Sequence, residues 1–143
     1  MTDTQTTVEL LGSVLVIDDD PALRVMLDKA LTRAGHDVTT VENGEAALEM
    51  LAREHFDLLI IDYMLPGITG LDVLKMARVN HPALMAIMIT AFPTDEVQAS
   101  AAALGVHAFV TKPFSVVQII KTCDEAIRVG LAAVGRGSQG PTG

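Results

Sequence analysis

The sequence predicts an α/β protein with a doubly wound, five-stranded parallel sheet and five helices. Short apolar runs, such as Val14–Ile17 and Leu58–Ile61, are typical of strands that are buried on both faces. Helical patterns separate these runs, and this alternation favours parallel strands joined by helical crossovers. The chain has 143 residues, 50% of them hydrophobic, which suits one compact domain.

The first strand, residues 14–17, is followed by a helix and then by a weaker strand. Asp20 is a good N-cap residue, and the proline after it favours the first helical position. Gly35 ends this helix. The second strand, at about residues 36–41, is polar and rich in threonine, which suggests the edge of the sheet. Asn43 and the glycine after it lead into the second helix.

The third strand ends at Asp62, and the loop at residues 63–70 comes directly after it. This loop contains a proline and two glycines, as expected where the chain must turn sharply beside the carboxylate. A third helix is predicted from about Leu71 to Asn80.

The last third of the chain repeats the alternation. The fourth strand covers residues 85–89, and the helix that opens near Asp95 stops at Gly105. The fifth strand covers residues 108–111. Ser115, with a glutamine three residues later, forms a capping-box pattern for a last helix that should reach about Val129.

These elements divide the chain into three parts. Residues 1–12 are expected to be a flexible N-terminal arm, and residues 13–129 the folded domain. Residues 130–143 are expected to be a flexible, glycine-rich tail. We expect no output domain in this chain.

Composition narrows the function. The formal charge of −8 argues against direct binding to nucleic acid or to an anionic membrane.

Cys123 is the single cysteine, so no internal disulfide can form; it is expected to pack on a helix. The N-terminal residues are polar and no stretch is long enough to span a bilayer, which predicts a cytoplasmic protein. The four histidines show no metal-ligand spacing and are interpreted as surface or satisfied loop residues.

Reactive side chains stand at the ends of four of the apolar runs. These residues are Asp18 and Asp19, Asp62, Thr90 and Lys112. The carboxyl ends of parallel strands meet at one edge of a sheet, and ligands of open α/β sheets bind there. We therefore expect the five side chains to converge on one site.

Three carboxylates at this edge require positive charge. At about 4 Å, two of them repel by roughly 4 kcal/mol at a near-surface dielectric. Lys112 and a divalent cation are the candidates, and hard oxygen ligands with open positions suit Mg²⁺. A shielded carboxylate can attack phosphorus and form an aspartyl phosphate. The pattern thus indicates phosphoryl transfer.

Four sequence motifs contain the reactive residues. They are Val14-Leu15-Val16-Ile17-Asp18-Asp19-Asp20, Ile61-Asp62-Tyr63-Met64-Leu65-Pro66-Gly67-Ile68-Thr69-Gly70, Ile89-Thr90-Ala91 and Phe109-Val110-Thr111-Lys112-Pro113-Phe114. Together these motifs resemble the receiver domain of two-component response regulators. The resemblance covers about Ser13 to Val129. It implies a flavodoxin-like fold with strand order 2-1-3-4-5.

The resemblance also implies roles for individual residues. Asp62 matches the phospho-acceptor, and Asp18 and Asp19 match the acidic pair that binds Mg²⁺, for which Mn²⁺ can substitute. Asp62 and the backbone carbonyl of Met64 would complete the protein ligands of this metal. Lys112 matches the lysine that contacts the phosphoryl group.

Thr90 and Phe109 match the switch hydroxyl and the switch aromatic of the family. The implied function is a phosphorylation-controlled signalling switch, whose donor is a histidine kinase or a histidine phosphotransfer protein. It would regulate a downstream protein or an output domain that is missing from this chain. The resemblance also implies a cis bond between Lys112 and Pro113.

Other interpretations remain open at this point. An isolated Asp-Asp pair is usually a structural or surface feature, and an aromatic residue such as Phe109 on a central strand is often simply core. An aspartate-nucleophile phosphatase of the haloacid dehalogenase type would need a second carboxylate at the position of Met64. We expect that the protein is not an enzyme and catalyses only its own phosphorylation and dephosphorylation. A phosphorylation-independent scaffold would have lost site residues, and none is lost. The expected state is a monomer or a weak, phosphorylation-dependent dimer.

Overall fold

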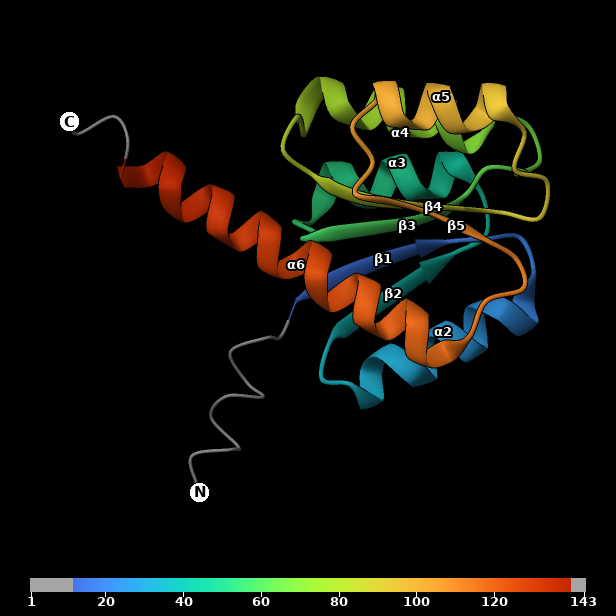
Figure 1. Cartoon of the computed structure of the whole chain (residues 1–143), viewed down its shortest axis with the longest axis horizontal. Coiled ribbons are helices and arrows are strands. Elements are labelled where there is room, and N and C mark those ends of the chain that lie inside the picture. The colour runs from blue at the N-terminus through green and yellow to red at the C-terminus, as the bar shows by residue number, and fades with distance from the viewer. Residues whose placement is uncertain (1–11, 140–143) are drawn as a thin grey trace.

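Five parallel strands form one sheet in the order β2-β1-β3-β4-β5 (Figure 1). The computed structural model describes residues 12–139, with side chains up to residue 133. The strands are β1 Ser13–Ile17, β2 Asp37–Val41, β3 Leu58–Asp62, β4 Met85–Thr90 and β5 Ala108–Thr111. The helices are α2 Pro21–Arg33, α3 Gly44–Arg53, α4 Gly70–Asn80, α5 Asp95–Ala103 and α6 Val116–Gln139. The predicted fold class and strand order are confirmed.

Helices cover both faces of the sheet. Helices α2 and α6 lie on one face, and α3, α4 and α5 lie on the other (Figure 1). Alternate residues of β1 point to opposite cores: Leu15 and Ile17 pack with α3 and α4, whereas Val14 and Val16 pack with α2 and α6. Apolar residues on both faces of a central strand explain why these strands are continuous apolar runs. β2 is half-exposed at the edge, as its polar sequence predicted.

The strand register brings the carboxyl ends of the strands together. Ile17 of β1 pairs with Ile61 of β3, and Asp62 pairs with Ile89 of β4. Thr90 in turn pairs with Thr111 of β5. The residues at or just after these ends therefore share one edge of the sheet.

Side-chain caps fix where the helices begin. Oδ1 of Asp20 accepts the Ala22 N–H at 3.0 Å, as predicted for the start of α2. Ser115 Oγ accepts the Gln118 N–H at 3.0 Å at the start of α6. The sequence analysis did not identify the capping box of α4, in which Thr69 and Asp72 each accept the other's N–H at 3.2 Å.

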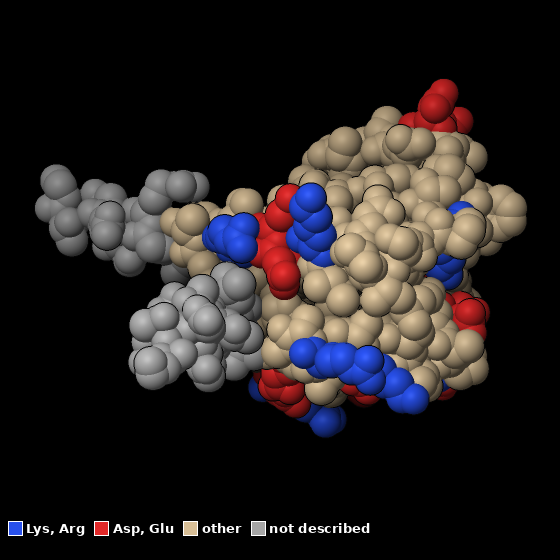
Figure 2. All heavy atoms as spheres, turned by 60° about the horizontal axis from the view of Figure 1, so that its bottom comes forward, with Lys and Arg blue, Asp and Glu red and all other residues tan. Residues whose placement is uncertain are grey.

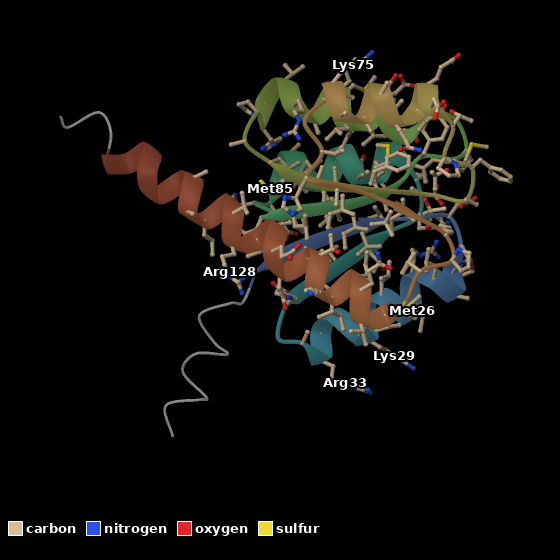
Figure 3. All side chains as sticks on the ribbon, viewed as in Figure 1. Met26, Lys29, Arg33, Lys75, Met85 and Arg128 are labelled. Carbon is tan, nitrogen blue, oxygen red and sulfur yellow. The ribbon has the colours of Figure 1, made fainter. Side chains whose placement is uncertain are left out.

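Helix α6 is longer than predicted. It was expected to end near Val129, but it continues to Gln139 and extends beyond the sheet (Figure 1). Gly130 was interpreted as part of a tail, yet a Cβ at this position would lie 2.8 Å from Cγ of Met85, beside which α6 passes (Figure 3). This glycine allows a close approach within the helix. Residues 131–133 are good helix formers, and an interior glycine costs only about 1 kcal/mol.

The N-terminal boundary of the domain lies at Gly12 or before it. The flexible arm was predicted for residues 1–12, of which residues 1–11 lie outside the described residues. Gly12 itself is buried, and its N–H donates to Nδ1 of His36 at 3.2 Å. Nε2 of His36 lies 2.8 Å from Oδ1 of Asp124. His36 is thus buried with both ring nitrogens hydrogen-bonded, and Gly12 belongs to the domain.

Two predictions about single features can also be compared with the structure. Cys123 is buried in the core on α6, where burial raises the pKa of its thiol to about 12. The Lys112-Pro113 bond is cis, as the resemblance implied. Among residues 12–139, none of the helices combines the length and apolar character that crossing a bilayer would require.

Candidate functional site

Three carboxylates meet at the carboxyl edge of the sheet. Asp18, Asp19 and Asp62 each place a carboxylate oxygen within 4.8 Å of the other two. Asp18 and Asp62 are buried, and Asp19 is exposed. The sequence placed these residues at strand ends, and the register of β1 with β3 brings them together. The result is an acidic cluster that is open to solvent on the side of Asp19.

Both oxygens of Asp62 have hydrogen-bond donors. The backbone N–H of Met64 donates to Oδ1 at 2.8 Å, and Nζ of Lys112 donates to Oδ2 at 2.5 Å. Lys112 also donates to Oδ2 of Asp18 at 3.1 Å. One ammonium therefore bridges the two buried carboxylates and offsets their repulsion.

Arg24 supports the acidic cluster from α2. Its Nη1 donates to the backbone carbonyl of Asp18 at 2.7 Å, while Oδ1 of Asp18 accepts the N–H of Asp20 at 2.9 Å. The Arg24 side chain is mostly buried, and its Nη2 lies 4.0 Å from the Glu42 carboxylate. The sequence analysis missed Arg24. Its signal was weak: it is the first basic residue of a helix that begins beside two carboxylates.

Burial and neighbouring charges shift the pKa values of Asp18 and Lys112. Burial raises the pKa of Asp18, and repulsion from Asp62 adds to this, while hydrogen bonds from Asp20 and Lys112 act in the opposite direction. Burial alone would lower the pKa of Lys112, but its hydrogen bonds to Asp62 and Asp18 outweigh it and raise that pKa. Lys112 is therefore held as an ammonium, whereas the charge on Asp18 is costly.

Thr90 is fully buried at the end of β4, beside the cluster. Its Oγ1 accepts the N–H of Phe92 at 3.1 Å, which fixes the first turn of the following loop. The backbone carbonyl of Thr90 accepts the N–H of Lys112 at 2.8 Å, so a backbone hydrogen bond holds Thr90 and Lys112 side by side. Phe109 is half-buried on β5 and packs against the core that β1 shares with α3 and α4.

Two glycines shape the loop after Asp62 for different reasons. Gly67 has a φ of +83°, a left-handed conformation that a Cβ disfavours. At Gly70, a Cβ would collide with the backbone carbonyl oxygen of Asp62 and would lie 3.0 Å from Cα of Tyr63. Gly70 also donates its N–H to the Tyr63 carbonyl at 2.8 Å. The start of α4 is thereby packed directly against the backbone of Asp62.

The donor set of the cluster fits a hard divalent cation. Three carboxylates supply oxygen ligands, and the exposed side at Asp19 leaves room for water or substrate oxygens. The resemblance also implied that the backbone carbonyl of Met64 is a ligand. That role stays a prediction, since the contact seen for Met64 is its N–H to Asp62. The acidic pocket could therefore bind a metal ion.

A model of the response regulator receiver domain matches residues 14–124 of this chain. The probable transcriptional regulatory protein TcrX of Mycobacterium tuberculosis is 34% identical over 128 residues, which are 89% of this chain and 55% of TcrX. The DNA-binding transcriptional regulator NtrC of Escherichia coli is 38% identical over 116 residues, 81% of this chain and 25% of NtrC. The chain thus spans about half of one relative and a quarter of the other.

Solved structures share the fold. A CheY-like receiver domain protein from Methanospirillum hungatei superposes with a TM-score of 0.83 at 24% identity, covering 86% of this chain and 98% of that one. The chemotaxis response regulator CheY4 of Vibrio cholerae gives a TM-score of 0.76 at 28% identity, over 81% of this chain and 98% of CheY4.

Proposed function

We propose, on the premise that this chain belongs to the response regulator receiver domain family, that Asp62 is its phospho-acceptor. Family membership makes the chain a phosphorylation-controlled signalling module of a two-component system. The donor would be the phosphohistidine of a histidine kinase or of a histidine phosphotransfer protein. The observation that carries the assignment is the setting of Asp62, a buried carboxylate held on one oxygen by a backbone N–H and on the other by Lys112.

The proposed reaction transfers one phosphoryl group. A carboxylate oxygen of Asp62 bonds to phosphorus as the phosphorus–nitrogen bond of the donor breaks, and the bonding electrons stay with the histidine nitrogen. The protein has little covalent work to do beyond supplying this nucleophile, so positioning and charge neutralisation dominate. The Lys112 ammonium offsets charge on one phosphoryl oxygen. The Thr90 hydroxyl would donate a hydrogen bond to another phosphoryl oxygen once it no longer accepts the Phe92 N–H.

The acidic cluster would hold Mg²⁺ through Asp18, Asp19 and Asp62, with the Met64 carbonyl as a backbone ligand. When bound, this cation neutralises negative charge on the phosphoryl group. The charge balance of the cluster supports the assignment, because three carboxylates meet there and Lys112 supplies one positive charge to two of them. Mn²⁺ has the same preference for oxygen ligands and would substitute.

Phosphorylation would alter the surface that follows Thr90. The phosphoryl group brings new acceptor oxygens, which draw in the Thr90 hydroxyl and the Lys112 ammonium. Because the Thr90 hydroxyl now holds the Phe92 N–H, its movement would release the loop that leads into α5. Phe109, on the neighbouring strand, would move with this loop. We propose that a downstream protein or an attached output domain recognises the changed surface.

Direct nucleic-acid binding by this part of the chain is not proposed. Figure 2 shows acidic side chains beside the basic ones on the face that α2 and α6 form. Lys29 and Arg33 on α2 and Arg128 on α6 are the labelled basic residues of this face in Figure 3. The mixed surface and the net charge of −8 oppose contact with a phosphate backbone.

Met64 stands at the position where a phosphatase of the haloacid dehalogenase type would need a second carboxylate, so we propose no turnover of external substrates.

Intact mass spectrometry after incubation with acetyl phosphate and Mg²⁺ tests the proposal. Wild type should gain the mass of one phosphoryl group, and Asp62→Asn should gain none. EDTA should prevent labelling of wild type. Asp95→Asn is the matched control, because Asp95 is an exposed carboxylate in the first turn of α5, and it should label like wild type. Equal labelling of wild type and Asp62→Asn would disprove the assignment.

A further inference from the structure

Arg78 in the last turn of α4 connects three segments of the chain through backbone carbonyls. Its Nε donates to Leu104 O at 2.9 Å and its Nη2 to Gly105 O at 3.2 Å, both at the C-terminal end of α5. Its Nη1 donates to Leu84 O at 2.5 Å and to Pro82 O at 3.2 Å, just before β4. Among the described residues, no carboxylate lies within ion-pair distance of Arg78.

The electrostatic setting explains how a cation is tolerated there. The last carbonyls of a helix carry a partial negative charge, and a cation is stabilised beside them. Leu104 is the C-cap of α5, so the guanidinium binds that helix end directly. The planar fork makes four hydrogen bonds to the two segments, whereas a lysine ammonium has only three N–H donors. Arg78 therefore fastens the C-terminal end of α5 to α4 and to the entrance of β4.

The rest of α5 is weakly attached to the protein. Only Val97 and Ala101 of this helix are buried, and its other residues are exposed. At its N-terminal end, the loop from Thr90 contains Ala91 and Phe92, which are both exposed. By contrast, four residues of α4 are buried. One end of α5 is thus clamped, and the other end is joined to the buried Thr90 by a loosely packed loop.

We propose that Arg78 fixes the C-terminal end of α5, so that this helix pivots at Leu104 and Gly105 when Asp62 is phosphorylated. This inference rests on the proposed function for its trigger. The movement starts at Thr90, and the clamp confines it to the N-terminal half of α5 and the loop before it. Without the clamp, the small buried surface of Val97 and Ala101 would let the whole helix loosen.

Amide hydrogen exchange in the free protein tests the clamp without any phosphoryl donor. The reporters are the hydrogen-bonded amides of Leu104 and Val106 at one end of α5, and of Val97 and Gln98 at the other. In wild type the first pair should exchange about tenfold more slowly than the second. Arg78→Met keeps an apolar stem and removes the fork, and it should abolish this difference. Arg53→Met, an exposed arginine in the last turn of α3, should preserve it.

Beryllofluoride, a phosphoryl mimic, tests the pivot in the same proteins. In wild type it should alter the exchange of Val97 and Gln98 and leave Leu104 and Val106 unchanged; in Arg78→Met both ends should respond. Equal exchange at the two ends of free wild-type α5 would overturn the clamp. An equal response of both ends to the mimic would overturn the pivot.

The wild-type measurements decide the proposal even if Arg78→Met does not fold. Arg78→Lys, which keeps the charge and loses the fork, then supplies the variant and should reduce the difference between the ends. A failure of the proposed function has a different signature. Beryllofluoride would then leave the amide exchange of Asp62 and Thr90 unchanged in wild type. The difference in exchange between the two ends of α5 in the free protein would still be observed.

Discussion

Nζ of Lys112 lies 2.5 Å from Oδ2 of Asp62, closer than to the second carboxylate that it contacts. In the free protein, the proposed acceptor is therefore paired with the lysine that would later contact its phosphoryl group. This pairing keeps Asp62 next to a positive charge before any cation binds. It also places an ammonium beside the cluster that would hold Mg²⁺, so the lysine and the metal oppose each other electrostatically.

Replacing this lysine should strengthen metal binding and weaken phosphorylation. In Lys112→Met the ammonium no longer repels the cation, and we expect Mg²⁺ to bind about tenfold more tightly by titration calorimetry. Phosphoryl transfer from acetyl phosphate should slow, because one contact to the phosphoryl oxygens is lost. Lys121→Met, on the exposed side of α6, should change neither property. Unchanged or weaker Mg²⁺ binding in Lys112→Met would show that the Lys112 ammonium does not repel the bound cation.

Asp18→Asn should stabilise the metal-free protein at neutral pH. The pKa of Asp18 is raised by burial and by Asp62, so its ionised form costs stability in the folded state. Asparagine can still accept the Asp20 N–H while carrying no charge. We expect the Tm to rise by about 5 °C without metal, and we expect Mg²⁺ to stabilise wild type more than the variant.

The pH dependence gives the sign of this effect. A carboxyl with a raised folded-state pKa favours folding when protonated, and this contribution is complete below its usual value of 3.8. It is lost as the pH rises through the folded-state pKa. The stability advantage of Asp18→Asn should therefore shrink as the pH falls from neutral toward that value. An advantage that grows on acidification would show that desolvation of Asp18 is not the cause.

Gly70→Ala should distort the acceptor backbone. The added Cβ would collide with the Asp62 carbonyl oxygen, and the backbone on both sides offers no flexible side chain that could move away. We expect urea unfolding to show a loss of about 2 kcal/mol or more, and labelling by acetyl phosphate to slow. Gly67→Ala is the comparison, since it introduces left-handed strain of about 1 kcal/mol without a collision. If both variants phosphorylate like wild type, the close approach does not position Asp62.

The strands and most of the candidate site could be predicted because their signals are local. Strands buried on both faces must be apolar throughout, so Val14–Ile17 and Leu58–Ile61 were recognisable without any tertiary information. Parallel pairing then places the residues after each strand at one edge. This geometry predicts that Asp18, Asp62, Thr90 and Lys112 lie at one site.

The contacts that the sequence did not predict involve backbone carbonyls. Arg24 binds the Asp18 carbonyl, and Arg78 binds carbonyls of two segments, but neither contact depends on the type of residue that offers the carbonyl. Such contacts leave no motif in the sequence. The end of α6 was missed for a related reason: Gly130 resembles a helix stop, and only the side chain of Met85 beside it shows why a glycine is needed there.

The lifetime of the phosphorylated state should depend on Met64 and Phe92. The Met64 N–H donates to Asp62 and the Phe92 N–H donates to Thr90, and the two residues are 54% and 68% exposed. Neither side chain can orient a water molecule by hydrogen bonding, and both are large enough to obstruct its in-line approach to phosphorus. We therefore expect slow hydrolysis of the aspartyl phosphate, which suits a sustained output or one reset by a partner phosphatase.

The test is the decay of phosphoprotein after the donor is removed, followed by intact mass. The Met64→Asn, Phe92→Glu double variant should lose its phosphoryl group about tenfold faster than wild type, because polar groups then orient the attacking water. Met76→Asn, Val79→Glu is the matched control. It changes two exposed apolar residues of α4 in the same way, and it should decay like wild type. If the first double variant decays no faster than this control, steric and polar effects of Met64 and Phe92 do not set the lifetime.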